Sequence, residues 1–272
     1  MNTRVSFNHQ ILSAEKTFIA AVSSAALYGK SIFTTLAVYN LKPFLWEKHW
    51  RRLRENADKI GLDLRGFDET SARHALLELV LLNNLKTGRA RLTFFDESAS
   101  PVWNFDSKNK TSLLITTAEF QNMKDEYLLT VSPYSINSKS PLAGTKSCNY
   151  LENILALEEA KKRGFDESVR LNEKREIVSA AMANVFWAKD EKIFTPALET
   201  GCLAGTTREF LMENFPVSET NSAIAELTEA DEIFLTSAAL GVRAARFAES
   251  TQKSSTVIVK LNKLLDLQRL KA

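Results

Sequence analysis

The order of hydrophobic and polar positions in the first 120 residues predicts a mixture of strands and helices. Residues 31–40 are rich in β-branched and aromatic side chains, which favour a strand, and residues 41–61 repeat apolar positions at helical spacing. A second helix is expected over residues 69–85, with Asp68 or Thr70 as its cap. Two further strands are expected over residues 88–98 and 111–120. This part of the chain is therefore predicted to be an α+β unit.

A second series of predicted strands and helices begins after a polar stretch at residues 121–126, which we interpret as a linker. Expected strands then follow at 127–135, 167–172, 176–180, 184–190, 192–197 and 232–242, the last of which breaks into a tight turn. A helix is expected at 149–164, and a glycine-containing turn that leads into a helix at 201–214. We therefore predict two domains, a small N-terminal α+β domain (residues 1–120) and a larger C-terminal α/β domain (residues 121–272). Length alone would also allow one large domain.

The composition of the chain excludes several classes of protein. The chain has 35 Lys and Arg against 33 Asp and Glu, a formal net charge of +2, so nothing in the overall charge favours a dedicated nucleic-acid binder. Two cysteines, Cys148 and Cys202, are too few for a disulfide framework, which favours the cytoplasm. No apolar run is long enough to span a membrane, and no histidine has partners at metal-ligand spacing, so we expect no membrane anchor and no metal.

Two turns have the residue types that bind anions or aldehydes. Residues 205–208 (Gly-Thr-Thr-Arg) open a predicted helix, where unpaired backbone N–H groups favour an anion, although Thr is also an ordinary helix cap. Lys146 lies in a turn between a strand and a helix, where burial would lower the pKa of its amine and make it a nucleophile for an aldehyde. A solvated lysine is the default alternative. Residues 144–147 lack the first glycine of a nucleotide-binding loop, and we reject that interpretation.

A basic cluster lies at residues 49–54. The simplest interpretation is an amphipathic helix with a solvated basic side, because no other basic patch supports nucleic-acid binding. Its arginines are expected to lie mostly opposite the apolar face, but one of them could point inward at a phosphate.

Six short motifs follow one another along the chain. They are Phe33-Thr34-Thr35, the H-x-x-R-L of His49, Arg52 and Leu53, the K-x-x-N of Lys146 and Asn149, Asn184-Val185-Phe186, the G-x-T-R of Gly205, Thr207 and Arg208, and the strand 232–237. In this order they resemble the class IV aminotransferase family. These fold-type IV enzymes depend on pyridoxal 5′-phosphate (PLP) and include branched-chain and D-amino-acid transaminases and 4-amino-4-deoxychorismate lyase.

The resemblance implies a D-amino-acid aminotransferase-like fold, with the cofactor at the interface of the two domains and a homodimer completing the site. Lys146 would hold PLP as an imine and shuttle protons, and Tyr150 would reach its phenolic oxygen. The phosphate would be held by Arg52, the amides of Thr206 and Thr207, the Thr207 hydroxyl, and the turn at Ser237-Ala238.

Departures from the family pattern bear on the reaction. Where members usually carry a glutamate that protonates the pyridine nitrogen, this chain has Ser179, which cannot supply the ion pair; Glu176 could substitute through a bulge. Ala238 in the last phosphate turn is closer to the lyase version. The arginine usual two residues after the Phe33-Thr34-Thr35 motif is Ala37, so Thr35, Arg89 and Arg91 are the candidate substrate-binding residues.

The resemblance and these departures favour an aminodeoxychorismate lyase-like β-elimination of a small amino substrate, giving 4-aminobenzoate for folate synthesis and pyruvate. The alternatives are an amino-acid transaminase with a 2-oxo acid acceptor and a PLP-binding homologue without turnover.

Overall fold

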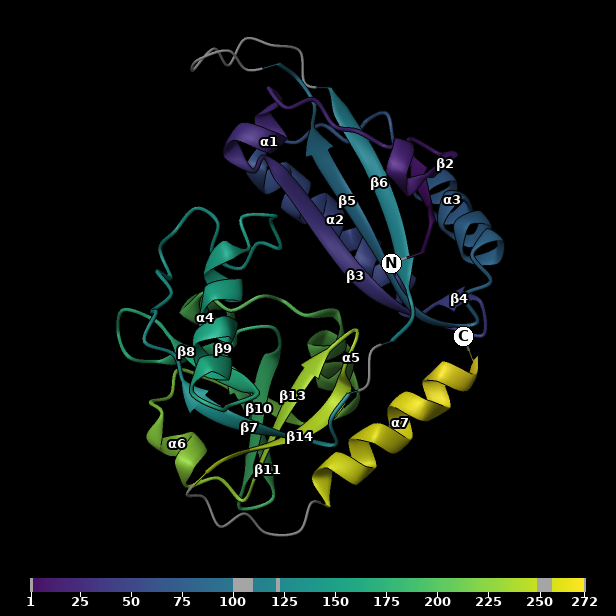
Figure 1. Cartoon of the computed structure of the whole chain (residues 1–272). Helices are drawn as coiled ribbons and strands as arrows, with labels where there is room; N and C mark the ends of the chain where they lie inside the picture. The colour runs from purple at the N-terminus through teal and green to yellow at the C-terminus, as the bar shows by residue number, and fades with distance from the viewer. Residues whose placement is uncertain (1, 100–109, 121–122, 249–255, 272) are drawn as a thin grey trace. The chain divides into compact units, whose positions relative to one another are not determined.

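The computed structural model describes residues 2–99, 110–120, 123–248 and 256–271 (Figure 1). The chain forms two compact units, each built on its own sheet. The first comprises Met1–Gln121 together with Thr145–Asn149, and the second comprises Asn122–Gly144 and Tyr150–Lys271. In the described residues, no helix is both long and apolar enough to cross a membrane.

The first unit contains a six-stranded antiparallel sheet. Its strands in spatial order are β2 (Gln10–Ser13), β1 (Arg4–Phe7), β6 (Thr111–Ala118), β5 (Thr87–Asp96), β3 (Ser31–Tyr39) and β4 (Lys42–Pro43). Strand β3 pairs along its whole length with β5, and β5 in turn pairs with β6. Strands β5 and β6 alternate between buried and partly exposed residues over much of their length, whereas β3 is buried along most of both faces.

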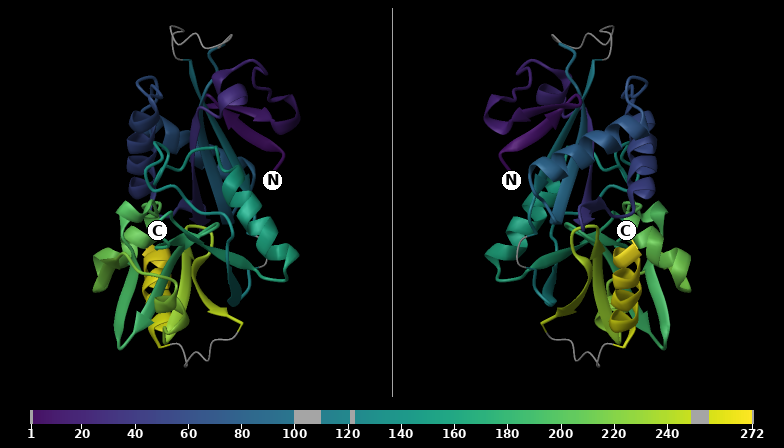
Figure 2. Two further views of the ribbon diagram at one scale, coloured as in Figure 1. Left: turned by 90° about the vertical axis from the view of Figure 1, so that its left-hand side faces the viewer. Right: turned by 90° about the vertical axis from the view of Figure 1, so that its right-hand side faces the viewer.

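Helices α2 (Trp46–Ile60) and α3 (Glu69–Leu82) cover one face of this sheet (Figure 1, Figure 2). Their apolar side chains share one core with the inward-facing residues of β3, β5 and β6. Asp68 caps α3, since its carboxylate accepts a hydrogen bond from the Ser71 amide. Two short helices, η1 (Ala14–Lys16) and α1 (Ser24–Tyr28), complete the unit.

Residues 145–149 join the first unit by pairing with the start of β3. The Phe33 amide donates to the carbonyl of Lys146 (2.9 Å), and the Cys148 amide donates to the carbonyl of Ser31 (3.0 Å). Ile32 and Ser147 form an antiparallel bridge between these bonds. The segment can pair here because β4 covers only the far end of β3, at Val38 and Tyr39. Backbone pairing therefore fixes Lys146 beside β3.

The second unit contains an eight-stranded mixed sheet. Its strands in spatial order are β12 (Val217–Thr220), β11 (Lys192–Pro196), β10 (Asn184–Lys189), β13 (Glu232–Ser237), β14 (Gly241–Phe247), β7 (Glu126–Val131), β8 (Glu167–Leu171) and β9 (Ile177–Ala180). The pairs β11–β12, β14–β7 and β7–β8 are parallel, and the others are antiparallel.

The helices of the second unit are α4 (Leu151–Lys162), η2 (Leu198–Thr200), α5 (Thr206–Asn214), α6 (Ala225–Thr228) and α7 (Val257–Lys271). Helix α4 packs on β8, α5 on β13 and α7 on β14. The N-terminus of α7 is capped from a strand, because the Glu232 carboxylate accepts hydrogen bonds from the amides of Thr256, Val257 and Ile258.

The predicted strands and long helices are present in this mixed α/β structure, with differences at several ends. The helix expected from residue 41 begins at Trp46, because Pro43 lies in β4 and Leu45 has a left-handed backbone (φ 54°). The segment 232–242, expected as a strand that breaks into a tight turn, forms β13, a turn at 238–240 and the start of β14. Among the elements that were not predicted are the β1–β2 hairpin, β12, most of β14 and α7. Of the predicted linker, Gln121 and Asn122 lie outside the described residues, and β7 already begins at Glu126.

Candidate active site

Lys146 lies against the aromatic ring of Phe33, its backbone partner on β3. The Lys146 Nζ is 4.5 Å from the ring centroid, and the Arg91 guanidinium carbon lies 3.6 Å from the same centroid. Arg91 is held there by hydrogen bonds from its Nε to the Thr93 hydroxyl (3.2 Å) and from its Nη2 to the Cys148 Sγ (3.5 Å). The structure thus brings the predicted lysine together with one of the predicted substrate-binding arginines.

The amine of Lys146 is tuned for nucleophilic chemistry. Burial, with smaller contributions from the guanidinium groups of Arg52 and Arg91, lowers the pKa of Lys146 from 10.5 to about 7, and Cys148 partly opposes the shift. A large fraction of the amine is therefore uncharged at neutral pH. An uncharged amine is the form that attacks an aldehyde and the form that accepts a proton from a carbon acid.

Arg52 is the inward-pointing member of the basic cluster on α2. It is buried, whereas Arg51 and Arg54 are exposed, so the cluster does not lie wholly on the solvated side. The Arg52 Nη2 donates to the Thr34 hydroxyl (2.8 Å), and the Thr34 oxygen lies 2.6 Å from the Nδ1 of His49. Thr34 therefore links the strand to two side chains of the helix.

His49 is neutral in this arrangement. Burial and the positive charges of Arg52 and Lys146 hold the pKa of His49 well below its usual value. Because Arg52 only donates, the Thr34 oxygen accepts from it, and we assign the Thr34 proton to the bond with the His49 Nδ1. The neutral His49 adds no further positive charge near Lys146, and the network fixes the position of the Arg52 guanidinium.

The three candidate substrate-binding residues lie on the opposite face of the sheet from α2. Thr35 on β3 is paired directly with Arg91 on β5, and Arg89 is paired with Ala37 two positions away. Alternation along the strands places all three side chains on one face, and each is partly exposed. Thr34, the residue before Thr35, faces α2 instead.

In the second unit, α5 begins with no side-chain cap. Its N-cap residue is Gly205, and Thr206 and Thr207 in the first turn are buried. Asn184 explains why residue 205 is a glycine. The Asn184 Nδ2 donates to the carbonyl of Leu203 (2.8 Å), and a Cβ at position 205 would clash with the Asn184 Oδ1. The Asn of the N-V-F motif therefore shapes the turn that leads into α5. An uncapped N-terminus of this kind suits an anion such as a phosphate.

Arg208, the last residue of the same motif, has a structural role. Its guanidinium donates to the carbonyl of Pro196 (3.1 Å) and forms an ion pair with Glu219. These bonds connect α5 to β11 and β12, and they explain the presence of Arg208 without a role in binding an anion.

Ser237 is the last residue of β13, and Ala238 opens the turn that leads to β14. The Ser237 hydroxyl accepts a hydrogen bond from the Leu240 amide (3.1 Å), which closes the turn. Just before it, the buried hydroxyl of Thr236 has no hydrogen-bond partner among the described residues. Thr236 is the cross-strand partner of Asn184, which shapes the start of α5. An unsatisfied buried hydroxyl beside an uncapped helix fits residues that bind a phosphate.

Ser179 lies on β9, opposite Arg170 on β8. The register passes from Arg170 opposite Ser179 to Leu171 opposite Ile177, so Val178 is an extra residue in β9. A bulge is thus present, but Glu176 is engaged elsewhere, because its Oε2 accepts from the Nδ2 of Asn172 (2.7 Å). Residue 179 therefore contributes a hydroxyl and no carboxylate.

Tyr150 is the N-cap residue of α4. Its role at the cofactor stays a prediction.

The comparisons with known proteins concern the chain as a whole. The sequence profile of the family described as amino-transferase class IV matches residues 31–246, most of the chain. The chain belongs to this family. The class IV enzymes are PLP-dependent lyases and aminotransferases, and PLP is the cofactor.

The relatives include lyases and aminotransferases. The aminodeoxychorismate lyase of Bacillus subtilis (strain 168) is 28% identical over 86% of this chain and 83% of its own length. Among solved structures, the branched-chain aminotransferase of Thermoproteus uzoniensis with norvaline superimposes with a TM-score of 0.93 at 23% identity, covering 100% of this chain and 96% of that one. The 4-amino-4-deoxychorismate lyase of Pseudomonas aeruginosa has a TM-score of 0.83 at 22% identity, covering 96% and 97%. These structural similarities establish a fold-type IV fold.

Sequence reasoning missed Thr34 as the link to His49, Asn184 as the brace of the α5 turn, and Arg170 as the neighbour of Ser179. A signal for Arg170 was present, because it is a charged residue between the apolar Val169 and Leu171 of the predicted strand 167–172. The other two depend on pairings between distant segments.

Proposed function

We propose that this protein is an aminodeoxychorismate lyase, which converts 4-amino-4-deoxychorismate into 4-aminobenzoate and pyruvate. The observation that carries the PLP chemistry is Lys146, an amine fixed beside β3 with its pKa lowered to about 7. The choice of elimination over amino transfer rests on Ser179, which cannot act as the acid that transaminases place at the ring nitrogen. The similarity to the Bacillus subtilis lyase over most of the chain supports the same choice.

When bound, PLP supplies an electron sink that stabilises negative charge on the carbon that loses a proton. We propose that Lys146 holds PLP, and that Arg52, Thr206, Thr207, Ser237 and Ala238 contribute to binding of its phosphate. Tyr150 would donate to the phenolic oxygen of the cofactor.

The reaction requires one proton transfer from carbon and one bond cleavage. Lys146 takes the proton from the carbon that bears the amine, and the carbon–oxygen bond on the neighbouring carbon breaks. The ring becomes aromatic as 4-aminobenzoate, and the enolpyruvate that leaves takes up a proton to become pyruvate. An uncharged amine with a pKa of about 7 can both accept and return this proton near neutral pH.

The substrate carries two carboxylates, and we propose that the guanidinium groups of Arg89 and Arg91 bind them with the help of Thr35. Arginine forms bidentate hydrogen bonds with a carboxylate, and all three side chains lie on one partly exposed face of the first sheet.

A transaminase that uses a 2-oxo acid is the second candidate. It is supported by the 25% identity, over 88% of this chain, to the D-alanine aminotransferase of Listeria monocytogenes serotype 1/2a (strain 10403S). Lys146 would serve the same proton transfers, so the two candidates differ in what leaves the substrate.

We further propose a cytoplasmic homodimer acting in folate synthesis. Both cysteines are free, as in proteins of a reducing compartment. Helix α4 exposes Leu151, Ile154 and Leu155, an apolar surface of the kind that a second subunit buries. Light scattering of the purified protein would measure the mass of the assembly.

The test is pyruvate release from 4-amino-4-deoxychorismate by the PLP-loaded protein, coupled to lactate dehydrogenase. We expect a yellow protein that releases pyruvate, and a Lys146→Ala variant that does neither. Lys192→Ala, which changes an exposed lysine on β11, is the matched control and should behave as wild type. Conversion of the cofactor to its amine form by simple amino acids, without pyruvate, would favour the transaminase. A wild type that binds no PLP would overturn the proposal, and a yellow protein inactive in both assays would be a binding homologue without turnover.

A further inference from the structure

We propose that the buried guanidinium of Arg170 determines the charge state of the PLP ring nitrogen and keeps it unprotonated. This inference rests on the proposed function and takes the ring nitrogen to lie at residue 179, where members of the family usually carry the glutamate. It assigns Arg170 as a positioning and tuning residue, and it implies that the missing glutamate cannot be restored by changing Ser179 alone.

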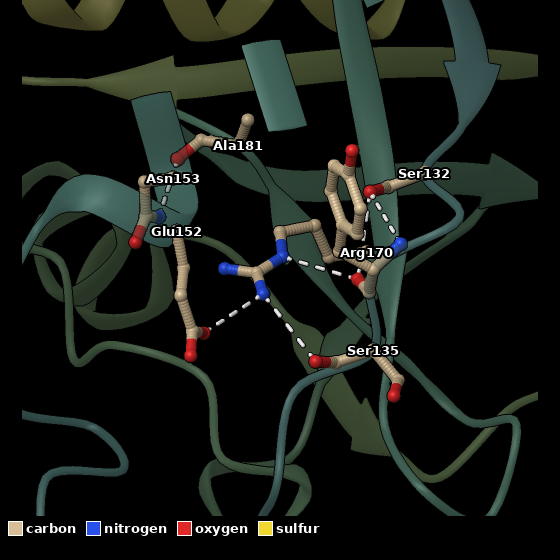
Figure 3. A network of polar contacts seen from close by, with 7 residues as sticks. Ser132, Ser135, Glu152, Asn153, Arg170 and Ala181 are labelled. Atoms are coloured by element: carbon tan, nitrogen blue, oxygen red, sulfur yellow. Dashed lines mark hydrogen bonds and ion pairs between the residues drawn. The ribbon is translucent and has the colours of Figure 1, made fainter. Parts of the chain in front are cut away.

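Arg170 is fixed in place by its surroundings (Figure 3). Its side chain is only 2% exposed, and it bonds to the carbonyl oxygens of Tyr134 and Ser135, each at 3.4 Å. Its acidic partner is Glu152 on α4, at 3.2 Å, and that carboxylate is 77% exposed. Much of the negative charge is therefore solvated, whereas the positive charge is held inside the protein.

Arg170 and Ser179 share one face of the β8–β9 pair. They are direct cross-strand partners, so their Cβ atoms are expected about 4.5–5.5 Å apart. The neighbouring residues Val169 and Ala180 face the opposite side, where they belong to the apolar core. A group that reaches the Ser179 hydroxyl therefore lies close to the arginine.

The acids of this region are engaged in other bonds. The Glu167 carboxylate accepts hydrogen bonds from the amides of Ser168, Ala181 and Met182, and burial raises the pKa of Glu167 to about 7. Glu176 is bonded to Asn172. Glu173 accepts hydrogen bonds from the amide and hydroxyl of Ser138.

A nearby cation disfavours a second positive charge, and arginine keeps its charge at every physiological pH. A ring nitrogen beside Ser179 and Arg170 is thus expected to stay neutral. A neutral ring is a weaker electron sink, which favours expulsion of a leaving group over reprotonation on the cofactor carbon. A glutamate introduced at position 179 would pair with Arg170 across the strands and leave the nitrogen neutral.

The test measures the ring nitrogen directly, by nitrogen-15 NMR of the protein loaded with ring-labelled PLP between pH 5 and pH 9. We expect a neutral nitrogen at pH 7 in wild type and in Ser179→Glu. Arg170→Leu should raise the pH of half-protonation by one unit or more, a tenfold change in proton affinity. The double variant Ser179→Glu/Arg170→Leu should be protonated at pH 7 and should form the amine form of the cofactor at least tenfold faster than Ser179→Glu.

Control variants distinguish the effect of the Arg170 charge from a disturbance of the structure. Arg163→Leu removes an arginine paired with Glu159 at the end of α4, and Glu152→Gln removes the acidic partner while keeping Arg170; neither should protonate the nitrogen at pH 7. Arg170→Gln replaces Arg170→Leu if circular dichroism shows that the leucine variant does not fold. A protonated nitrogen in wild type at pH 7, or a Ser179→Glu variant as fully protonated as the double variant, would overturn the inference. A wild type without bound PLP would instead overturn the proposed function.

Discussion

The carbonyl of Lys146 accepts a hydrogen bond from the amide of Phe33, while its amine lies 4.5 Å from the centroid of the Phe33 ring. One residue of β3 therefore holds the lysine by its backbone and desolvates its side chain. Burial at this position, together with Arg52 and Arg91, lowers the pKa of Lys146, and this pKa is the property that can be measured most simply.

The lowered pKa predicts selective modification of Lys146. In the protein without cofactor, an amine-specific acylating reagent should modify Lys146 with a half-maximal rate near pH 7, whereas exposed lysines need a pH near 10.4. Mass spectrometry of peptides after brief labelling at pH 6, 7, 8 and 9 would measure this. Equal labelling of Lys146 and Lys192 across the series would contradict the assignment.

The same shift predicts that Lys146→Met stabilises the protein without cofactor. Between pH about 7 and about 10.4, the unfolded chain binds more protons at residue 146 than the folded chain, so wild-type stability rises with pH. Below pH 7 the lysine is charged in both states, and the folded protein bears the full cost of a buried charge. The variant should therefore melt at a higher temperature than wild type at pH 6, by about 2–4 °C for each kcal/mol regained.

The stabilisation by Lys146→Met should diminish as the pH approaches 10. Calorimetry at both pH values would check this, with Lys192→Met as the matched control. A variant less stable than wild type at pH 6 would show that the amine makes interactions that outweigh its burial.

Thr34→Val should loosen Arg52. The substitution keeps the shape but removes the oxygen that accepts from Arg52 and contacts His49, so a loss of about 1–3 kcal/mol is expected, with weaker PLP binding. Thr35→Val is the neighbouring control on the opposite face; it should leave stability within about 0.5 kcal/mol and raise the substrate KM instead. Urea unfolding and PLP titration would measure the stability and cofactor affinity of both variants. Equal losses in the two variants would contradict the different roles assigned to Thr34 and Thr35.

Gly205→Ala should disrupt the start of α5. The added Cβ would clash with the Asn184 Oδ1, so we expect a loss of about 1–3 kcal/mol and reduced affinity for PLP. Gly66→Ala is the control, because a Cβ at Gly66 meets nothing within 4 Å. On an Asn184→Ala background the cost of Gly205→Ala should fall, and a double-mutant cycle without such coupling would contradict this account.

Local patterns predicted much of the fold because many elements are internally consistent. The β-branched run of β3 and the apolar spacing of α2 each point to one structure, and alternation alone places Thr34 and Thr35 on opposite faces. The end of α2 was equally readable, because Gly61 follows it with a left-handed backbone (φ 66°).

The rest depended on pairings that no local pattern contains. The bulge at Val178, and with it the placement of Arg170 opposite Ser179, follows from the register of two strands. The placement of Lys146 beside Phe33 requires a segment more than a hundred residues away to pair with β3. The motifs identified the lysine, but only the fold shows what lowers its pKa.

The assignment of residues 145–149 to the first unit has a consequence for dissecting the gene. The polypeptide passes between the two units three times, after residues 121, 144 and 149. A fragment cut at the first passage would therefore lack the very lysine that β3 holds, and the remaining fragment would carry that lysine without its strand. Neither fragment contains both the lysine and the strand that positions it. Moving this reactive amine to another protein therefore requires the coding sequence of both units.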